Sequence, residues 1–599
     1  MRSRLALLVA LFAPPPAGTA PALKPVIRYT LRADSADLSG WNVEIRLPNV
    51  ADTFRLAMAA HPEYDDRYWR YVTAFTVESS GGPATFTRVD SAVWQVVAPP
   101  GAVVVRYRIA LPAPAPLPRA SWRPFLTSRG GLLGGPHAFM YLIGAEHAPV
   151  QVTLDLPAAW EVATGLVPSA DRRTVTAANA AALLDAPILA GPLRQWSFVA
   201  GGRPHRVVYW PLPDAAPFDT VAFVSGIHAM VQQAIALFGR APYQAYTFLF
   251  QDGAYGALEH RSSVTLGAPS AELTRDPNAA LQETAHEFVH TWNLLQIRPV
   301  EYREVDYRTQ PPVASLWFSE GLTLFYADLL LRRAGVQLRD STRVAHLERL
   351  IGRYLANPAY ARFSAEAVSR VAYNAEPGAL GDYSASTHLQ GELIGAMLDL
   401  LVRDATRGRR SMDDVMRLLF DRASDGSGVD GRGIERAVEA VCGCDVTPFF
   451  DAYVRGAAII DFDRYLGLIG LKTTVRSAPA VWNGEAERDL RIFGWEPPGD
   501  SGVRLIITDP ASIWGRAGLH SGDRLARADG ERVATWPALR ARLQGLRIGD
   551  TVRLEVRRPA GPFEAAVTVA GFERPTVRIE RAPNATEAQR RLAEAWLRR

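Results

Sequence analysis

Residues 281–293 read LQETAHEFVHTWN and contain the pattern His-Glu-Phe-Val-His. On a helix, residues four apart lie on the same face, so His286 and His290 can bind one cation while Glu287 reaches the space beside it. This spacing is typical of zinc peptidases that use the glutamate as general base. The stretch therefore predicts a zinc site on a helix, and the alternative is two surface or core histidines that chance placed four apart.

A catalytic zinc takes a third protein ligand and leaves a fourth position for water. Residues 315–331, SLWFSEGLTLFYADLLL, supply Glu320 on the next predicted helix. Trp317 and Phe318 precede this carboxylate and Gly321 follows it, whereas an ordinary solvated helix face would be more polar. Glu320 is therefore the predicted third ligand.

The composition indicates a soluble globular protein with several folding units. The 599 residues are too many for one hydrophobic core, and 48% of them are hydrophobic and 21% charged. Lys and Arg exceed Asp and Glu by only four, and the arginines are not grouped in a basic, aromatic-interleaved stripe. We therefore expect no nucleic-acid partner.

The start of the chain is typical of a secretory signal peptide. Arg2 and Arg4 precede an apolar run from Leu5 to Ala13, and small residues end near Ala20. The run is shorter than the roughly 20 residues that span a bilayer, and we find no other candidate span. Residues 1–20 are therefore predicted to be a signal peptide of a periplasmic or secreted protein without a membrane span. A frayed cytoplasmic N-terminus is the alternative.

The pattern of apolar residues divides the rest of the chain. Alternating apolar and polar positions between Pro, Gly and Asp breaks predict an all-β domain at the N-terminus. Helical patterns around a strand-like segment predict a mixed domain after it, followed by a small third unit. The predicted division is 21–204 for the β-rich domain, 205–471 for the catalytic domain, 472–489 for a linker, 490–573 for the third unit and 574–599 for a tail with a C-terminal helix.

Two short motifs carry weaker signals. RGGLLGGPHAF, residues 129–139, lacks the Lys-Ser/Thr ending of a phosphate loop and is predicted to be a flexible turn. Cys442 and Cys444 are the only cysteines, so there is no disulfide scaffold, and a bridge between them would be strained though possible in an oxidising compartment. Without histidines nearby they also make a weak metal site.

Several stretches together resemble a known peptidase family. HEFVHTWN, the RP dipeptide at Arg298, SLWFSEGLTLFYADLLL, LDLLVRDATRGRRSMDDVMRLL and the third unit are similar to the glycyl aminopeptidase family of gluzincin zinc metallopeptidases, which carry a PDZ domain. The resemblance implies a multidomain fold: an N-terminal all-β domain, a thermolysin-like α+β peptidase domain with a helical C-terminal part, and a C-terminal PDZ domain. It also implies that His286, His290 and Glu320 bind Zn²⁺ and that Glu287 is the general base.

A second segment bears on where a substrate is cut. YGALEHRSS, residues 255–263, looks like the family's Gly-x-x-Glu-His segment, which is comparable to the edge-strand motif that holds a free amine in related aminopeptidases. By this resemblance Glu259 pairs with the α-ammonium of a peptide, a charge-assisted bond, and Gly256 and His260 belong to the same substrate-binding segment. The residues alone would equally suit a solvated Glu-His-Arg turn.

Residues 383–400, YSASTHLQGELIGAMLDL, depart from the family pattern. The family usually has paired tyrosines there, where this chain has THLQ. If the family's tyrosine stabilises the tetrahedral oxyanion, that donor is missing or replaced. His388 and Tyr383 are the candidate replacements because either side chain can donate the same hydrogen bond. The alternative for His388 is a plain surface histidine.

The third unit resembles a PDZ domain of the bacterial protease type. RAGLHSGDRLARADGERV, residues 516–533, carries Gly518, Gly522 and Gly530 at positions that suit tight turns. The helix that begins near Thr535 would form one wall of a peptide groove. The unit either binds a peptide or only contacts the catalytic domain.

Together these features predict a zinc aminopeptidase that removes residues from peptides with a free N-terminus. A preference for Gly or Ala is implied only by the family resemblance. One alternative is a zinc endopeptidase in which Glu259 has no role in amine binding. Another is a catalytically weakened, PDZ-bearing peptide-binding protein, which the missing tyrosines favour and the intact zinc motif opposes.

Overall fold

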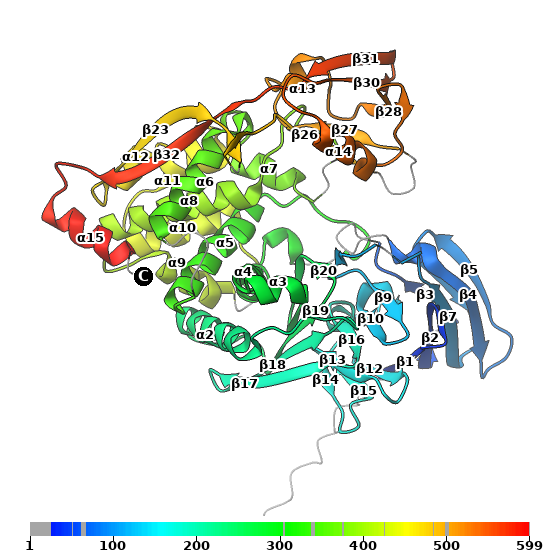
Figure 1. Cartoon of the computed structure of the whole chain (residues 1–599). Helices are drawn as coiled ribbons and strands as arrows, with labels where there is room; N and C mark the ends of the chain where they lie inside the picture. Colours follow the sequence, from blue (N-terminus) through cyan, green and yellow to red (C-terminus); the bar gives the residue numbers. More distant parts are fainter. Residues whose placement is uncertain are drawn as a thin grey trace, which may run out of the picture.

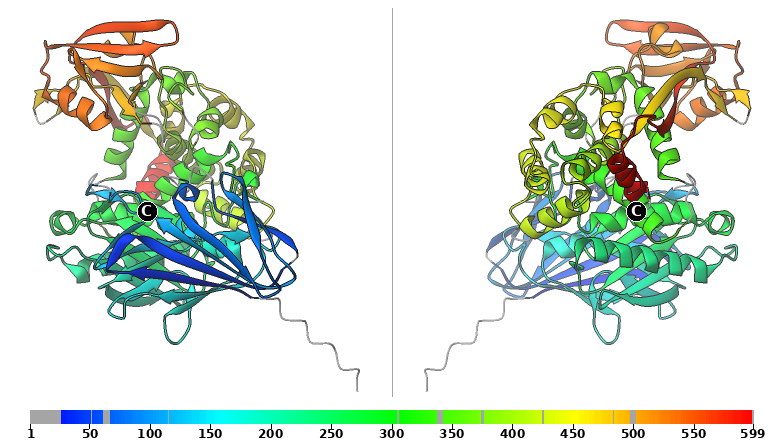
Figure 2. Two further views of the ribbon diagram at one scale, coloured as in Figure 1. Left: turned by 90° about the vertical axis from the view of Figure 1, so that its right-hand side faces the viewer. Right: turned by 90° about the vertical axis from the view of Figure 1, so that its left-hand side faces the viewer.

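The computed structural model describes residues 26–597 except 51, 61–66, 115, 304–305, 337–341, 374–375, 424–425, 483 and 497–501. The predicted signal peptide lies outside the described residues. A β-rich N-terminal domain lies beside a largely helical part, and a small β-unit sits at the far end of the helical part from the N-terminal sheets (Figure 1). The turned views show the same three parts (Figure 2).

The N-terminal domain is built from strands whose alternate side chains are buried, as the sequence pattern predicted. In β1 (Ile27–Asp34), Tyr29 and Leu31 face the core while Arg28 and Arg32 face solvent. A seven-stranded and a four-stranded sheet share one core around Trp41. The seven-stranded sheet runs β14 (Val167–Pro168), β15 (Thr174–Ala177), β12 (Val150–Asp155), β1, β2 (Asp37–Val50), β7 (Gly101–Ala110), β4 (Val72–Ser79), and the other β11 (Tyr141–Leu142), β3 (Thr53–Ala57), β6 (Val93–Val97), β5 (Thr85–Asp90).

The glycine-rich stretch at 129–139 is not a flexible turn. Its first half forms β10 (Gly130–Gly134), a fully buried strand between β9 (Phe125–Thr127) and β16 (Pro187–Gly191) in a sheet that ends at β13 (Glu161–Thr164). A Cβ atom on Gly131 would lie 2.1 Å from the carbonyl oxygen of Phe125. The glycine therefore lets a neighbouring backbone approach closely, which composition alone does not distinguish from turn chemistry.

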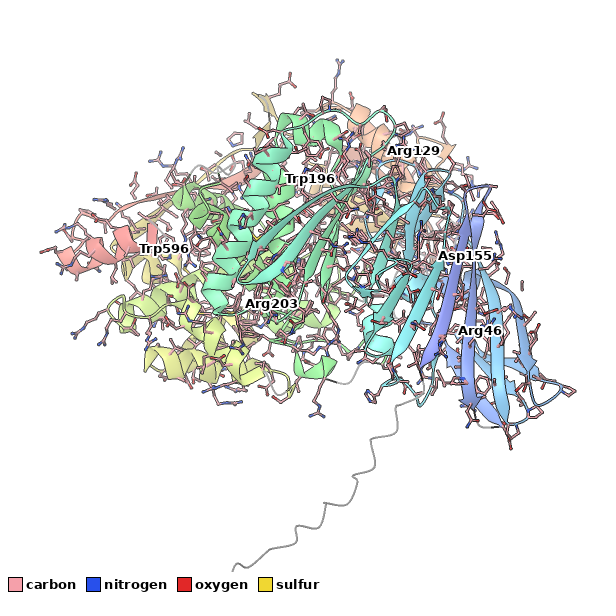
Figure 3. The ribbon with its side chains drawn as sticks, turned by 90° about the horizontal axis from the view of Figure 1, so that it is seen from below. Arg46, Arg129, Asp155, Trp196, Arg203 and Trp596 are labelled. Carbon is pink, nitrogen blue, oxygen red and sulfur yellow. A yellow bond between two sulfur atoms is a disulfide. The ribbon has the colours of Figure 1, made fainter. Side chains whose placement is uncertain are left out.

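The next sheet belongs to the catalytic domain. Its first strand lies before residue 204, where the sequence predicted the domain boundary. The strand predicted as the last of the N-terminal domain, β17 (Arg194–Ala200), pairs with β18 (Arg203–Trp210) at the edge of a five-stranded sheet. Trp196 and Arg203 lie on this sheet, away from Arg46 and Asp155 on the N-terminal sheet (Figure 3). The sheet continues through β19 (Tyr246–Gln251) and β22 (Ser263–Gly267) to β21 (Ala257–His260).

The helices of the catalytic domain pack around one large core. Among the described residues, α2 is the one helix long and apolar enough to cross a membrane, and its buried side chains lie in this core. Helix α9 begins with a capping box of Ser411 and Asp414, and Cys442 and Cys444 at the end of α10 form a disulfide. The helices are α2 (Thr220–Phe238), α4 (Asn278–His290), α5 (Leu316–Arg333), α6 (Arg343–Leu355), α7 (Ala365–Val371), α8 (Thr387–Ala405), α9 (Met412–Arg422), α10 (Gly431–Cys442) and α12 (Phe462–Gly467).

The predicted linker at 472–489 is largely a strand. β23 (Leu471–Pro479) pairs along its whole length with β32 (Glu573–Arg581), which lies in the predicted tail. Between them a separate core supports the small β-unit of β26 (Ile492–Trp495), β27 (Arg504–Ile507), β28 (Arg524–Ala528), β30 (Thr551–Arg558), β31 (Gly561–Thr568), α13 (Ile513–Arg516) and α14 (Trp536–Gly545). We call this the C-terminal unit.

The predicted C-terminal helix forms as α15 (Glu587–Leu597) and returns to the catalytic domain. The Arg343 guanidinium lies 3.9 Å from the ring centroid of Trp596, and the Trp596 indole N–H donates to Asp399 Oδ2 at 3.1 Å. Figure 3 shows Trp596 at the opposite end of the molecule from the N-terminal sheets.

Candidate active site

The two histidines of the opening stretch point at one place. Their Nε2 atoms lie 3.1 Å apart, across one turn of α4. The Nδ1 atom of His290 lies 3.0 Å from the carbonyl oxygen of Asn293, so this nitrogen carries the proton. The Nε2 lone pair of His290 is therefore available to a metal ion.

Helix α5 brings Glu320 to the same place. Glu320 Oε2 lies 3.5 Å from His286 Nε2 and 3.3 Å from His290 Nε2, and the side chain is buried. Asn293 joins the two helices because its side-chain N–H₂ donates to the carbonyl oxygens of Phe318 and Ser319 at 3.1 Å each. Asn293 is the last residue of the HEFVHTWN stretch. Its role in joining α4 to α5 could not be predicted, because the sequence does not show that its side chain contacts Phe318 and Ser319.

The three donor atoms fit a zinc ion. Nitrogen and oxygen ligands bind zinc at about 2.0–2.2 Å in tetrahedral geometry, which separates ligand atoms by roughly 3.3–3.6 Å. The separations of 3.1, 3.3 and 3.5 Å between His286, His290 and Glu320 are close to this range. Two imidazole nitrogens and a carboxylate oxygen this close together need either a proton or a metal cation between them.

The electrostatics of the cluster agree with this fit. Burial opposes the charged form of His290, but the carboxylates of Glu320, Glu259 and Glu287 outweigh it and raise its pKa to about 10. Burial raises the pKa of Glu287, and the neighbouring Glu259 raises it further. Three carboxylates thus gather around two histidines, and such a cluster favours a divalent cation.

Helix α8 adds His388 to the cluster. Its Nε2 atom lies 3.1 Å from Glu320 Oε2, and its ring stacks on that of His286 with centroids 5.7 Å apart. His286, Glu320 and His388 thus also have ligand atoms within 4.8 Å of one another. The His388 side chain is 44% exposed, whereas that of His290 is 3% exposed. His388 therefore lies at the mouth of the cluster and His290 at its floor.

A close contact between two glycines sets this arrangement. A Cβ atom on Gly321 would lie 2.2 Å from the backbone of Gly391, and one on Gly391 would lie 1.8 Å from the carbonyl oxygen of Trp317. Since α5 and α8 touch backbone to backbone here, the first turn of α8 reaches Glu320.

Tyr373 and Tyr383 have different surroundings. Tyr383, a predicted donor, has its ring 5.8 Å from that of Phe363 and under the guanidinium of Arg362. Tyr373, which sequence reasoning missed, donates its hydroxyl to Glu320 Oε1 at 2.6 Å. Tyr373 follows α7 and lacks a motif of its own, so only the fold could place it.

The Gly-x-x-Glu-His segment forms a strand rather than a turn. Glu259 lies on β21, the edge strand of the catalytic sheet. Burial raises the pKa of its carboxyl group; His290 opposes this shift and Glu320 adds to it. The next residue, His260, has its Nδ1 atom 3.8 Å from Asp185 Oδ1 of the N-terminal domain. Gly256 adopts a positive φ of 67°, and a Cβ atom there would lie 2.9 Å from the Trp122 ring.

A cavity of about 140 Å³ adjoins Glu259 and His260. Its walls come from the β10 segment and α1 (Ala180–Leu184) of the N-terminal domain and from the segment that follows α4. Leu133, Leu258 and Leu294 contribute apolar surface to it. The glycine-rich stretch thus forms one wall of a cavity next to the metal cluster.

Comparisons with known proteins agree with this architecture. The family model of the peptidase M61 N-terminal domain matches residues 28–192, and that of the M61 glycyl aminopeptidase matches residues 279–394. A sequence search of curated proteins returned no match.

Among solved structures, the chain is similar to an aminopeptidase N family protein from Idiomarina loihiensis, with a TM-score of 0.76 and 21% identity over 96% of this chain and 100% of the other. An M1 zinc metallopeptidase from Deinococcus radiodurans gives a TM-score of 0.46 and 14% identity over 73% and 95% of the two chains. Leukotriene A4 hydrolase from Saccharomyces cerevisiae gives 0.43 and 13% over 74% and 67%. The first of these shares the fold of this chain along nearly its whole length.

The M61 family models thus match the two regions that surround the cluster, the β-rich N-terminal domain and the part of the catalytic domain that carries the two histidines and Glu320, and these matches identify the chain as a peptidase.

Proposed function

We propose that this peptidase is a zinc-dependent aminopeptidase. The observation that carries the proposal is the triangle of His286, His290 and Glu320, whose donor atoms are spaced for one zinc ion. A zinc ion held there supplies Lewis-acid chemistry, because it polarises a peptide carbonyl and makes water a better nucleophile at neutral pH.

The proton transfers are assigned to Glu287. It follows His286 directly in the chain, is 7% exposed, and its raised pKa suits a group that takes a proton from water and then delivers it to the leaving amine. His388, at the mouth of the cluster, is the group proposed to donate a hydrogen bond to the developing oxyanion. Tyr373 is proposed to hold Glu320 in its ligating orientation.

Glu259 is proposed to bind the free N-terminus of the substrate. An edge strand offers unpaired backbone groups to an extended peptide, and the Glu259 carboxylate on that strand lies close enough to Glu287 to raise the pKa of Glu287. A peptide α-ammonium would neutralise part of the excess negative charge. This assignment makes the enzyme an exopeptidase rather than an endopeptidase.

The proposed preference for small N-terminal residues, Gly or Ala, comes from the family. The cavity beside Glu259 has room for more than a methyl group. A series of otherwise identical peptides with Gly, Ala, Leu or Phe at the N-terminus measures this preference directly. Higher kcat/KM for Leu and Phe would contradict it.

The C-terminal unit is proposed to be a PDZ domain. Its support is an edge strand, β26, beside helix α14, with the exposed Phe493 ring 6.3 Å from that of Trp536. Strand addition beside such a helix is how PDZ domains bind chain termini. A periplasmic or secreted location is likewise proposed, from the leader pattern alone.

A Glu287→Gln variant tests the catalytic assignment. We expect the variant to retain stoichiometric zinc and to lose at least about a hundredfold in kcat. Glu272→Gln is the matched control, since Glu272 is exposed on the preceding helix α3 (Ser270–Arg275). Equal activity of Glu287→Gln and wild type, or purified protein without zinc, would refute the mechanism.

A pair of peptides separates the two kinds of peptidase. We expect hydrolysis of a free peptide and none of its N-acetylated twin, because the acetyl group removes the ammonium that Glu259 would bind. Glu259→Gln should raise KM for the free peptide. Cleavage of both peptides at internal bonds would establish an endopeptidase instead.

A further inference from the structure

The C-terminal unit touches the chain segment that leads into the active site. This segment, residues 376–386, connects α7 to α8. The Asp382 carboxylate accepts a hydrogen bond from the Ser521 backbone N–H at 2.7 Å, and its other oxygen lies 2.6 Å from His520 Nδ1. His520 and Ser521 belong to the GLHSGD turn of the C-terminal unit, residues 518–523.

The turn is itself firmly held. Asp523 accepts hydrogen bonds from the His520 backbone N–H at 2.9 Å and from two nitrogens of Arg558 at 2.6 Å each. The two backbones also lie next to each other, since Cβ atoms on Gly522 and Gly378 would be in ordinary van der Waals contact with the Pro377 oxygen at 3.7 Å and the Ser521 oxygen at 3.6 Å. The contact is therefore close along both chains and has a rigid base.

From Asp382 the same segment runs directly to the metal cluster. The Asn357 amide donates to the Ser384 carbonyl oxygen at 2.8 Å, and the Ser386 N–H donates to the Tyr360 hydroxyl at 3.0 Å. Ser386 then caps α8, with its side chain accepting from the Leu389 N–H at 3.3 Å. His388 lies in the first turn of this helix.

We propose that Asp382 is a positioning residue through which the C-terminal unit holds the first turn of α8, and so His388, against Glu320. The unit would then be part of the catalytic apparatus, independent of any peptide that it binds. The inference rests on the role proposed for His388. Charge-assisted bonds to a segment next to an active site can change activity through geometry alone.

Four single variants of the full-length chain, and one double variant, test this. Asp382→Ala removes both contacts, His520→Ala removes one, and Asp382→Asn keeps an acceptor for the Ser521 N–H. Asp529→Ala is the matched control, because Asp529 in the same unit also accepts a backbone N–H, from Arg553 at 2.8 Å, and lies in an ion pair with Arg542 at 3.0 Å.

We expect kcat for a free peptide to fall about 3- to 30-fold in Asp382→Ala, with KM and zinc content unchanged. Asp382→Asn should recover at least half of wild-type kcat, and Asp529→Ala should match wild type. The Asp382→Ala/His520→Ala double variant should lose no more than Asp382→Ala, since both changes break one contact. Hydrogen exchange of the amides in the first turn of α8 should become faster in Asp382→Ala.

Several results would overturn the proposal. These are kcat within twofold of wild type in Asp382→Ala, an equal loss in Asp529→Ala, or losses that multiply in the double variant. His520 lies on the surface with its side chain 57% exposed, so His520→Ala gives the kinetic comparison if Asp382→Ala does not fold. Absence of peptidase activity in the wild type would instead refute the proposed function itself.

Discussion

Replacing Gly391 by alanine perturbs the point where α5 and α8 touch. The added methyl carbon would lie 1.8 Å from the carbonyl oxygen of Trp317, and the Gly321 Cα would lie 2.9 Å from it. Ordinary contacts between such atoms exceed about 3.4 Å, so the two backbones must separate by more than about an ångström. The clashing atom belongs to the backbone of α5, and Trp317 itself is fully buried, so no flexible side chain can move aside to relieve the contact.

The magnitude follows from two opposing effects. Alanine favours helix over glycine by about 0.5–1 kcal/mol. Overpacking a close-packed core costs typically 1–3 kcal/mol and occasionally more, and a backbone clash lies at the upper end. We expect a net loss of about 1–3 kcal/mol in the free energy of unfolding, which lowers Tm by roughly 3–10 °C for a domain of this size. The separation also moves His388 from Glu320, so kcat should fall.

Thermal unfolding of the zinc-loaded chain measures the change, with peptidase activity as a second readout. Gly467→Ala is the control, because Gly467 ends helix α12 and a Cβ atom there meets no atom within 4 Å. It should leave Tm unchanged or raise it slightly. If Gly391→Ala melts at or above wild type, the glycine contact does not set the spacing of α5 and α8.

Three further predictions follow from buried polar groups. Asn293→Ala should weaken zinc binding about 10- to 100-fold in a chelator competition, because α4 and α5 lose the hydrogen bonds that align His290 with Glu320. Burial lowers the pKa of His205 to about 4, so between pH 4 and 6.5 this residue binds more protons in the unfolded chain than in the folded one. Its contribution should make the free energy of unfolding fall by up to about 1 kcal/mol per pH unit as the pH drops below 6.5. The His205→Gln variant should lack this contribution. Trp596→Ala should destabilise the catalytic domain by about 3–5 kcal/mol in denaturant unfolding, because Arg343 and Asp399 lose a buried partner.

Several helices can be recognised from the sequence, because their signals are local. Asp219 caps α2, and the Ser411 box begins α9. The N-terminal strands also agree, since period-two burial shows in the order of residues. The predicted boundary at 204 and the predicted linker at 472–489 differ from the structure, because the strands there pair with other strands that the local sequence does not reveal. β17 pairs with β18 in the catalytic sheet, and β23 pairs with β32.

The candidate site divides in the same way. His286 and His290 are related by one helical turn, so their spacing alone predicts that their side chains meet. Glu320 required a second helix, and its apolar neighbours gave a usable signal. Tyr373 and Asn293 gave none, because each acts on a group in another element of the fold.

The sequence by itself determined the helix with two histidines and a glutamate, the candidate third ligand Glu320, and the order of β-rich, helical and C-terminal parts. Those features depend on periodicity and spacing within single elements. Only the tertiary structure decided that His388 lies against Glu320, that Tyr373 rather than Tyr383 donates to that carboxylate, and that Asp382 is held by the C-terminal unit. These contacts depend on how closely α8 approaches α5, which two glycines far apart in the chain permit through backbone contact.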